Sequence, residues 1–271
     1  MYALAYHRPR SLTEAKAMFV DGLDATFLSG GHTLLPTLKQ RLAAPTDLVD
    51  LTYIPEMKGI VRDGEVLRIG AASTHSEVFE SNVVRSAIPV LAKLAGSIAD
   101  RHVRHRGTIG GSTANNDPAA DYPSAVLALN ATVVTDRREI AADDFFLGLF
   151  ETAREPGEIL TRIDFPVPKL AAYAKFKSPA SRYSIAGVFV ARTGGNVRVG
   201  VTGAGASGVF RATAFEEALE RDFRPEALDG VSLDPNGMLS DLNGTGEYRA
   251  HLAQVLCRRA VAHPGDCQAF K

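Results

Sequence analysis

The chain has 271 residues, a length that fits two compact domains or one large domain with an appendage. Its 30 Lys and Arg residues and 31 Asp and Glu residues give a formal net charge of -1, so no overall field attracts nucleic acid or an anionic membrane. Two cysteines, Cys257 and Cys267, are too few for a disulfide framework or for an iron–sulfur cluster held by four thiolates. With no signal peptide at the start and no apolar run long enough to span a membrane, we expect a cytoplasmic protein.

The first part of the chain predicts a small unit that ends near residue 53. Ser11 and Glu14 have the spacing of a capping box, so we expect a helix to begin there. A double-glycine turn, Ser29–Thr33, connects a strand pattern to a helix pattern. In chain order the expected elements are a helix from Ser11, a strand over 25–28, a helix over 34–42 and a strand over 47–51.

The second segment, residues 54–167, begins with strands and continues with helices. A second double-glycine turn, Thr108–Ser112, precedes a polar stretch that ends at Asp121. The expected elements are a hairpin of strands over 60–62 and 66–69, and helices over 74–80, 88–98 and 119–129.

The third segment, residues 168–271, predicts an antiparallel hairpin followed by two helices. The hairpin strands are expected over 188–192 and 197–201, and the helices over 213–220 and 248–261. Because strands group with strands and helices with helices, the pattern favours the α+β class over a doubly wound sheet.

The two double-glycine turns carry the strongest chemical signal. Each combines glycines, which allow a ligand to approach the backbone closely, with hydroxyl side chains and N–H donors at the start of an expected helix. Either turn alone is also explained as a tight turn with a Ser or Thr cap. Two turns of such similar design indicate a ligand that contains a pyrophosphate.

Other motifs give weaker signals. A literal G-x-G-x-x-G occurs at Gly203–Gly208, but no buried strand pattern follows its helix, which disfavours a dinucleotide site there. His102 and His105 lie among three arginines, whose charges would repel a divalent cation, so we predict no metal site and interpret the cluster as a solvated or partner-facing basic patch. No hydrolase nucleophile elbow is present.

The paired motifs resemble the FAD-binding medium subunit of molybdenum hydroxylases, of the carbon monoxide dehydrogenase medium-subunit type, with the FAD domain of xanthine dehydrogenase as a more distant relative. The resemblance covers nearly the whole chain, and its two motifs have the family's order and spacing. Ser29, Thr33 and His105 stand where alanine, serine and asparagine are usual in the family. The matching stretches are Ser29-Gly30-Gly31-His32-Thr33-Leu34-Leu35-Pro36, Arg106-Gly107-Thr108-Ile109-Gly110-Gly111-Ser112 and Asp117-Pro118-Ala119-Ala120-Asp121.

This resemblance implies a vanillyl-alcohol-oxidase-like (PCMH-type) FAD-binding fold of two subdomains, residues 1–53 and 54–167. A C-terminal α+β domain of the carbon monoxide dehydrogenase flavoprotein type, residues 168–271, would follow.

The resemblance also implies which residues hold FAD. Asp121 would bond to the ribose or ribityl hydroxyls, Tyr183 would lie near the isoalloxazine ring, and Lys177 would lie near the pyrimidine end of the flavin. No further catalytic residue is assigned. The pyrophosphate would be held by Ser29, Gly30, Gly31, His32 and Thr33 on one side, and by Thr108, Ile109, Gly110, Gly111 and Ser112 on the other.

The implied function is electron transfer within a heterotrimer. A large subunit would carry molybdopterin, a small subunit would carry two [2Fe-2S] clusters, and FAD on this chain would pass their electrons to NAD, quinone or oxygen. Two alternatives are a nucleotide-binding or assembly module without turnover and a stand-alone flavin oxidoreductase. The second alternative is disfavoured because no motif for covalent flavin attachment and no acid–base pair near the glycine turns is evident.

Overall fold

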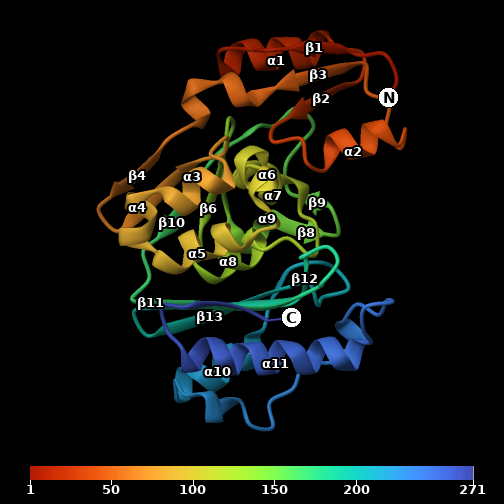
Figure 1. Cartoon of the computed structure of the whole chain (residues 1–271). Helices are drawn as coiled ribbons and strands as arrows, with labels where there is room; N and C mark the ends of the chain where they lie inside the picture. The colour runs from red at the N-terminus through yellow and green to blue at the C-terminus, as the bar shows by residue number, and fades with distance from the viewer. Residues whose placement is uncertain (271) are drawn as a thin grey trace.

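A computed structural model describes residues 1–270 and shows three units, each containing one main β-sheet, stacked on one another (Figure 1). The mixture of helices and strands confirms the α+β class. Each main sheet is built from a contiguous part of the chain, and the domain boundaries near residues 53 and 167 stay predictions.

The first unit, at the top of Figure 1, holds a parallel three-stranded sheet in the order β1-β3-β2. The Ser11 side chain accepts a hydrogen bond from the Glu14 N–H and caps the first helix, as the sequence predicts. The second helix ends at Lys39, earlier than expected, because Arg41 adopts a left-handed conformation with φ of 60°. The elements are β1 (Ala5–His7), α1 (Leu12–Asp21), β2 (Ala25–Leu28), α2 (Leu34–Lys39) and β3 (Asp47–Asp50), followed by 3₁₀ turns at Leu51–Tyr53 and Pro55–Met57.

The second unit has an antiparallel sheet in the order β4-β5-β10-β6-β7, with short helices packed around it. The expected hairpin of β4 and β5 is confirmed. The helix expected over 119–129 begins only at Tyr122, because Asp117 accepts a hydrogen bond from the Ala119 N–H and closes a turn there. The strands are β4 (Ile60–Asp63), β5 (Val66–Gly70), β6 (Thr132–Thr135), β7 (Glu139–Ala141) and β10 (Leu160–Pro166), with a separate hairpin of β8 (Phe146–Gly148) and β9 (Glu151–Thr152). The helices are α3 (His75–Glu80), α4 (Asn82–Ala87), α5 (Pro89–Ser97), α6 (Arg101–Arg106), α7 (Ile109–Asn115), α8 (Tyr122–Ala128) and α9 (Ala142–Phe145).

The third unit has a five-stranded sheet in the order β14-β13-β12-β11-β15, in which β15 pairs parallel with β11. The expected hairpin of β12 and β13 is confirmed, and the two expected helices are present beneath the sheet in Figure 1. The elements are β11 (Leu170–Lys177), β12 (Ser184–Thr193), β13 (Asn196–Thr202), β14 (Phe210–Arg211), α10 (Thr213–Arg221), α11 (Gly246–Ala262) and β15 (Cys267–Phe270), with 3₁₀ turns at Pro225–Leu228 and Pro235–Gly237.

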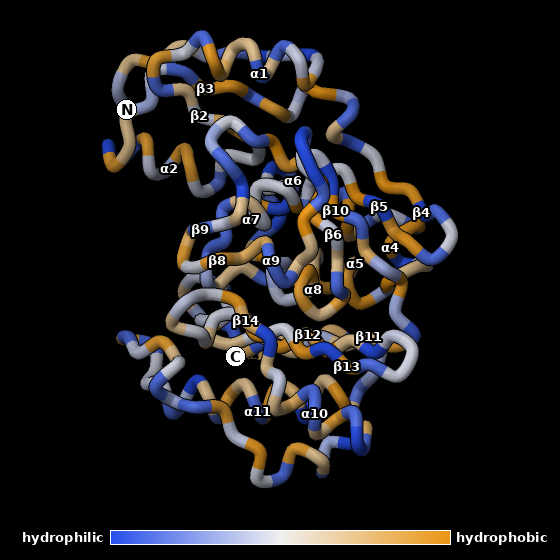
Figure 2. Tube along the Cα trace, turned by 180° about the vertical axis from the view of Figure 1, so that it is seen from behind, coloured by the Kyte–Doolittle hydropathy of each residue, from blue (hydrophilic) through white to orange (hydrophobic). Residues whose placement is uncertain are grey.

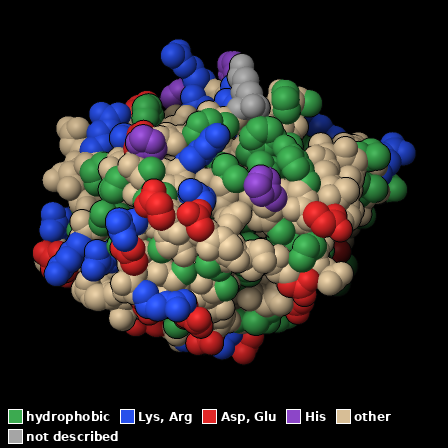
Figure 3. Space-filling view, turned by 90° about the horizontal axis from the view of Figure 1, so that it is seen from below, with side chains coloured by type: hydrophobic (Ala, Val, Ile, Leu, Met, Phe, Trp, Pro, Cys, Tyr) green, Lys and Arg blue, Asp and Glu red, His purple; other side chains and the backbone are tan. Residues whose placement is uncertain are grey.

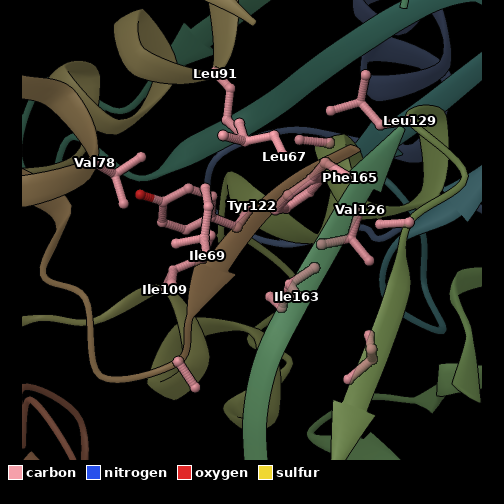
Figure 4. Packing of buried hydrophobic residues seen from close by; sticks show 14 of the residues in the cluster. Leu67, Ile69, Val78, Leu91, Ile109, Tyr122, Val126, Leu129, Ile163 and Phe165 are labelled. Carbon is pink, nitrogen blue, oxygen red and sulfur yellow. The ribbon is translucent and has the colours of Figure 1, made fainter. Parts of the chain in front are cut away.

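The third sheet separates two hydrophobic cores. Ala172 and Ala174 of β11 pack in the core that α10 and α11 cover, whereas Tyr173 belongs to the larger core of the first two units. This alternation places one face of β11 against the second unit. Figure 4 shows part of the larger core, where Ile69, Ile109 and Val78 lie close to Tyr122, and in Figure 2 hydrophobic residues are seen along α8 and β12.

The stretch Gly203–Gly208 follows β13, which is antiparallel to both of its neighbours in the sheet. A dinucleotide site of the Rossmann type needs a parallel strand pair at that point. No helix within residues 1–270 is long and apolar enough to cross a membrane. On the face seen in Figure 3, basic and acidic side chains are interspersed.

Candidate cofactor site

The two glycine turns, which are far apart in the sequence, meet in one cavity. The Ser29 and Thr108 hydroxyl oxygens lie 2.7 Å apart, so the end of β2 is hydrogen-bonded to the start of α7. A cavity of about 450 Å³ lies against both turns and extends to the segment before β12. Its volume is in the range of small-molecule and cofactor sites.

The first turn presents unused backbone donors. The N–H groups of residues 30–33 form no hydrogen bond within residues 1–270, although all four residues line the cavity. The Thr33 side chain does not cap α2, and the His32 side chain is exposed. Because free N–H groups and hydroxyl groups are suitable partners for phosphate oxygens, this turn fits an anionic group.

Close packing explains why glycines are needed at this turn. A Cβ atom on Gly30 would lie 2.4 Å from the Arg106 carbonyl oxygen, a distance that real Cβ atoms do not reach. Gly31 has φ of +75°, in the left-handed region that favours glycine. The turn is therefore pressed against the end of α6, and its backbone forms the cavity wall.

The second turn differs from the sequence-based expectation, because its N–H groups are already used in the fold. The Ile109 N–H donates to the Ser73 carbonyl, the Gly110 N–H to Ala71 and the Gly111 N–H to the Thr108 hydroxyl. This turn therefore offers the Ser112 hydroxyl and the Cβ-free surface of Gly111 to the cavity rather than a second set of amides.

Two of the residues expected to bind the cofactor do not line the cavity. The Ile109 side chain is fully buried in the core, as Figure 4 shows, because it is the first residue of α7 and points away from the turn. Lys177 is the last residue of β11 and is not among the residues that line the cavity. Two positions earlier on the same face of the strand, Lys175 is fully buried and contacts Asp121 from behind the cavity wall.

Asp121 and Tyr183 both line the cavity, as expected. Asp121 is only 6% exposed, and its carboxylate accepts hydrogen bonds from within the protein. Tyr183 is half-exposed at the rim, and burial together with the charges of Asp117 and Asp121 raises the pKa of its phenol. A protonated tyrosine ring at the rim can cover a planar ligand.

His75 is a cavity residue that sequence reasoning missed. It begins α3 and is almost fully buried beside Tyr122, with ring centroids 5.4 Å apart. Burial lowers the pKa of its imidazole to about 4, so the ring is neutral at pH 7. The Thr74–Glu77 capping box predicts the helix start, but nothing in the local sequence indicates that His75 faces a cavity.

A second missed group lies where β9 leads into β10. Arg154 and Glu158 both line the cavity, and the Arg154 guanidinium donates to the Ala114 and Glu158 carbonyl oxygens. Burial opposes ionisation of Glu158, but hydrogen bonds from Arg138, the Glu155 N–H and Thr135 outweigh it and lower the pKa of Glu158 to about 2. The buried carboxylate is therefore charged and balanced by Arg138.

Neither cysteine offers a reactive thiolate. Burial raises the pKa of both thiols, that of Cys267 to about 12. Among residues 1–270 no group of three His, Cys, Asp or Glu side chains is arranged to hold a metal ion.

Comparison with known proteins identifies relatives of the whole chain. Residues 2–168 match the family described as FAD binding domain in molybdopterin dehydrogenase. The chain is similar to the carbon monoxide dehydrogenase medium chain of Afipia carboxidovorans, with 36% identity over 94% of each protein. It is also similar to the nicotine 6-hydroxylase medium subunit of Paenarthrobacter nicotinovorans, with 32% identity over 97% of this chain and 98% of the relative.

A solved structure of similar fold supports the same relationship. A chain in the crystal structure of a Cu,Mo-containing CO dehydrogenase superimposes with a TM-score of 0.87 and 34% sequence identity. The match covers 96% of this chain and 97% of that chain, so all three units take part.

Proposed function

Because the chain belongs to the family of FAD-binding domains in molybdopterin dehydrogenases, we propose that FAD bound here passes electrons from the iron–sulfur clusters of a partner subunit to an external acceptor. The chain is an FAD-dependent oxidoreductase subunit of the medium-chain type. Its partners in this proposal are a molybdopterin-binding large subunit and an iron–sulfur small subunit. Oxidation of the substrate then takes place on the large subunit.

The observation that carries the proposal is that residues 30–33, whose N–H groups form no hydrogen bond within residues 1–270, line the cavity beside the Ser29–Thr108 hydrogen bond. We assign these amides and the Thr33 hydroxyl to the pyrophosphate of FAD. The second turn contributes the Ser112 hydroxyl and a surface at Gly111 with no side chain.

The other cavity residues orient the cofactor and exclude water. Tyr183, at the rim, covers the flavin ring. Its phenol is protonated and its ring is largely apolar, so the side chain is suited to packing on a planar group. His75 stays neutral, so it acts as a hydrogen-bonding group and adds no charge. Asp121 accepts hydrogen bonds and is suited to hydroxyl groups of the cofactor rather than to its phosphates.

Flavin binding is tested by titrating the purified chain with FAD and recording the absorption spectrum, followed by anaerobic reduction with dithionite. The proposal expects one FAD per chain, with visible bands that bleach on reduction. A folded chain that shows no binding, alone or with its two partner subunits present, would contradict the proposal.

The placement of the pyrophosphate is tested by a pair of variants of equal side-chain shape and different charge, Gly111→Asp and Gly111→Asn. A Cβ atom here lies 2.8 Å from the Thr108 hydroxyl and 3.5 Å from the Ser29 Cβ, so both variants introduce the same steric strain. Only the aspartate adds a negative charge beside the first turn. We expect the Asp variant to bind FAD at least tenfold more weakly than the Asn variant, and equal affinities would place the pyrophosphate elsewhere.

A further inference from the structure

The most deeply buried lysine or arginine among residues 1–270 lies directly behind the cavity wall. Lys175 of β11 is 0% exposed, and its Nζ atom lies 2.9 Å and 3.1 Å from the two carboxylate oxygens of Asp121. It also donates to the Ser97 carbonyl at the end of α5, at 3.3 Å. One ammonium group therefore joins the third sheet to two helices of the second unit.

The Asp121 carboxylate is held entirely from the side of the third sheet. Besides Lys175, the Tyr173 hydroxyl donates to it, and so does the Ser184 hydroxyl, at 2.8 Å. All three donors lie on the face of β11 or at the start of β12 that meets the second unit. An ionised carboxylate has about four acceptor positions, so these contacts fill most of them.

The backbone before Asp121 is also hydrogen-bonded to the third sheet. The Thr202 hydroxyl donates to the Pro118 and Ala120 carbonyls, and the Gly203 N–H donates to Pro118 at 2.7 Å. The loop over residues 117–121 forms one wall of the cavity and is thus attached to β12 and β13. The third sheet therefore sets the position of this wall.

Among residues 1–270, Lys175 is the one positively charged partner of Asp121 at neutral pH. Burial lowers the pKa of His75 to about 4, which leaves its ring neutral, and burial raises the pKa of Cys267 to about 12. Burial also raises the pKa of each tyrosine nearby, so these phenols are uncharged. The titratable groups that face Asp121 are Lys175 and Tyr173 of β11, Tyr183 before β12, Tyr122 of α8, His75 of α3 and Cys267 of β15.

Stability alone does not account for a buried pair of this kind. Taking two charges out of water is costly, and apolar residues of similar volume often stabilise a core equally well. A charged pair at the wall of a cavity is instead explained if the site requires the Asp121 carboxylate to be charged and fixed in position.

We propose that Lys175 is a positioning residue for the cofactor site, which holds Asp121 charged and fixed in the cavity wall and so links FAD binding to the third sheet. This inference rests on the proposed function, since it takes FAD as the ligand. Lys175 acts through Asp121 and does not itself reach the cavity. If the pair is broken by removing the cation, the buried carboxylate is left without compensation and takes up a proton more readily.

The test is the pH dependence of FAD affinity in the full chain carrying Lys175→Met, which keeps the length of the side chain but removes its charge. For the wild type we expect an affinity that varies little between pH 6 and pH 8.5. For the variant we expect FAD binding about tenfold or more weaker at pH 6 than at pH 8.5, because the buried carboxylate without its cation takes up a proton as pH falls and then accepts hydrogen bonds less well. The double variant Asp121→Asn/Lys175→Met has no titrating group at position 121, so it should show a flat profile at about the weak affinity that Lys175→Met has at pH 6.

Two controls separate positioning from general damage. Lys169→Met removes an exposed lysine just before β11, and Ser184→Ala removes an uncharged donor to the same carboxylate. Both should leave the pH profile flat. A pH-independent loss of affinity in Lys175→Met, or a double variant whose affinity still depends on pH, would overturn the proposal. A wild-type chain that binds no FAD, with or without its partners, would instead contradict the proposed function.

If the Lys175→Met variant does not fold, the proposal is tested by comparing the FAD affinity of Asp121→Asn with that of Asp121→Asn/Lys175→Met. Removal of Lys175 on the Asp121→Asn background should change FAD affinity less than twofold, because the residue that it positions is already neutral. A larger loss on that background would show that Lys175 acts independently of Asp121, and the proposal would fail.

Discussion

Ser29 and Thr108 are 79 positions apart in the sequence, yet their hydroxyl oxygens lie 2.7 Å from each other and both residues line the cavity. Thr108 also accepts a hydrogen bond from the Gly111 N–H and so caps α7. One hydroxyl group therefore both begins a helix and joins the two glycine turns. The shape of the cofactor site depends on this contact between the first and second units.

Replacing Thr108 with valine should damage both stability and FAD binding. Valine keeps the shape of the side chain but leaves the Gly111 N–H and the Ser29 hydroxyl without their partner, so we expect a loss of about 1–2 kcal/mol in the free energy of unfolding. Chemical denaturation of the apo-protein and FAD titration measure the two effects. Ser29→Ala, which retains the helix cap, should cost less, and equal stability losses in both variants would argue against this role of Thr108.

Gly30→Ala should reduce FAD affinity because the added methyl group has no room. Its Cβ atom would meet the Arg106 carbonyl oxygen at 2.4 Å, and the turn has to move away from α6 to relieve the contact. Overpacking of this kind costs about 1–3 kcal/mol. Gly195→Ala, in the open turn between β12 and β13, is the matched control and should bind FAD normally. Normal FAD binding by the Gly30 variant would contradict the tight fit.

Local sequence signals predict a hairpin well where the turn residues and the flanking strand residues both favour it. The hairpin of β12 and β13 is evident because β-branched residues flank a turn containing Gly194 and Asn196. The strand β11 has no such signal, because Leu170–Lys177 is rich in alanine and lysine, which are depleted in strands. Its conformation is set by pairing with β12 on one side and β15 on the other.

The candidate site is also only partly predictable, because some of its features are local and others depend on tertiary packing. The glycine turns are visible because their residue types are constrained locally, whereas the Ser29–Thr108 contact depends on how two units pack. Burial of Lys175 has no local signal, since lysine is almost always exposed. The alternation of β11 places Lys175 and Lys177 on one face, and only tertiary packing decides which of them meets Asp121.

Arg138→Met should destabilise the chain much more than Arg137→Met, although the two arginines are adjacent. Arg138 pairs with Glu158, whose side chain is fully buried, whereas Arg137 pairs with Glu155, which is exposed. Leaving Glu158 unpaired should cost about 2–4 kcal/mol, while loss of the exposed pair should cost less than about 1 kcal/mol. Urea denaturation of both variants at pH 7 measures the difference, and similar losses would show that Glu158 needs no counterion.

The free energy of unfolding should depend on pH in the range between the pKa of His75 in the folded protein and its pKa in the unfolded chain. Burial lowers the pKa of the folded imidazole from 6.5 to about 4, so the unfolded chain binds the proton more readily and falling pH favours unfolding. Between pH 7 and pH 5 we expect this group to lower the free energy of unfolding by about 2 kcal/mol. His75→Gln, which is neutral at every pH, should lack that part of the pH dependence. Urea denaturation at pH 7, 6 and 5 compares the two proteins, and parallel curves would mean that the folded imidazole titrates normally.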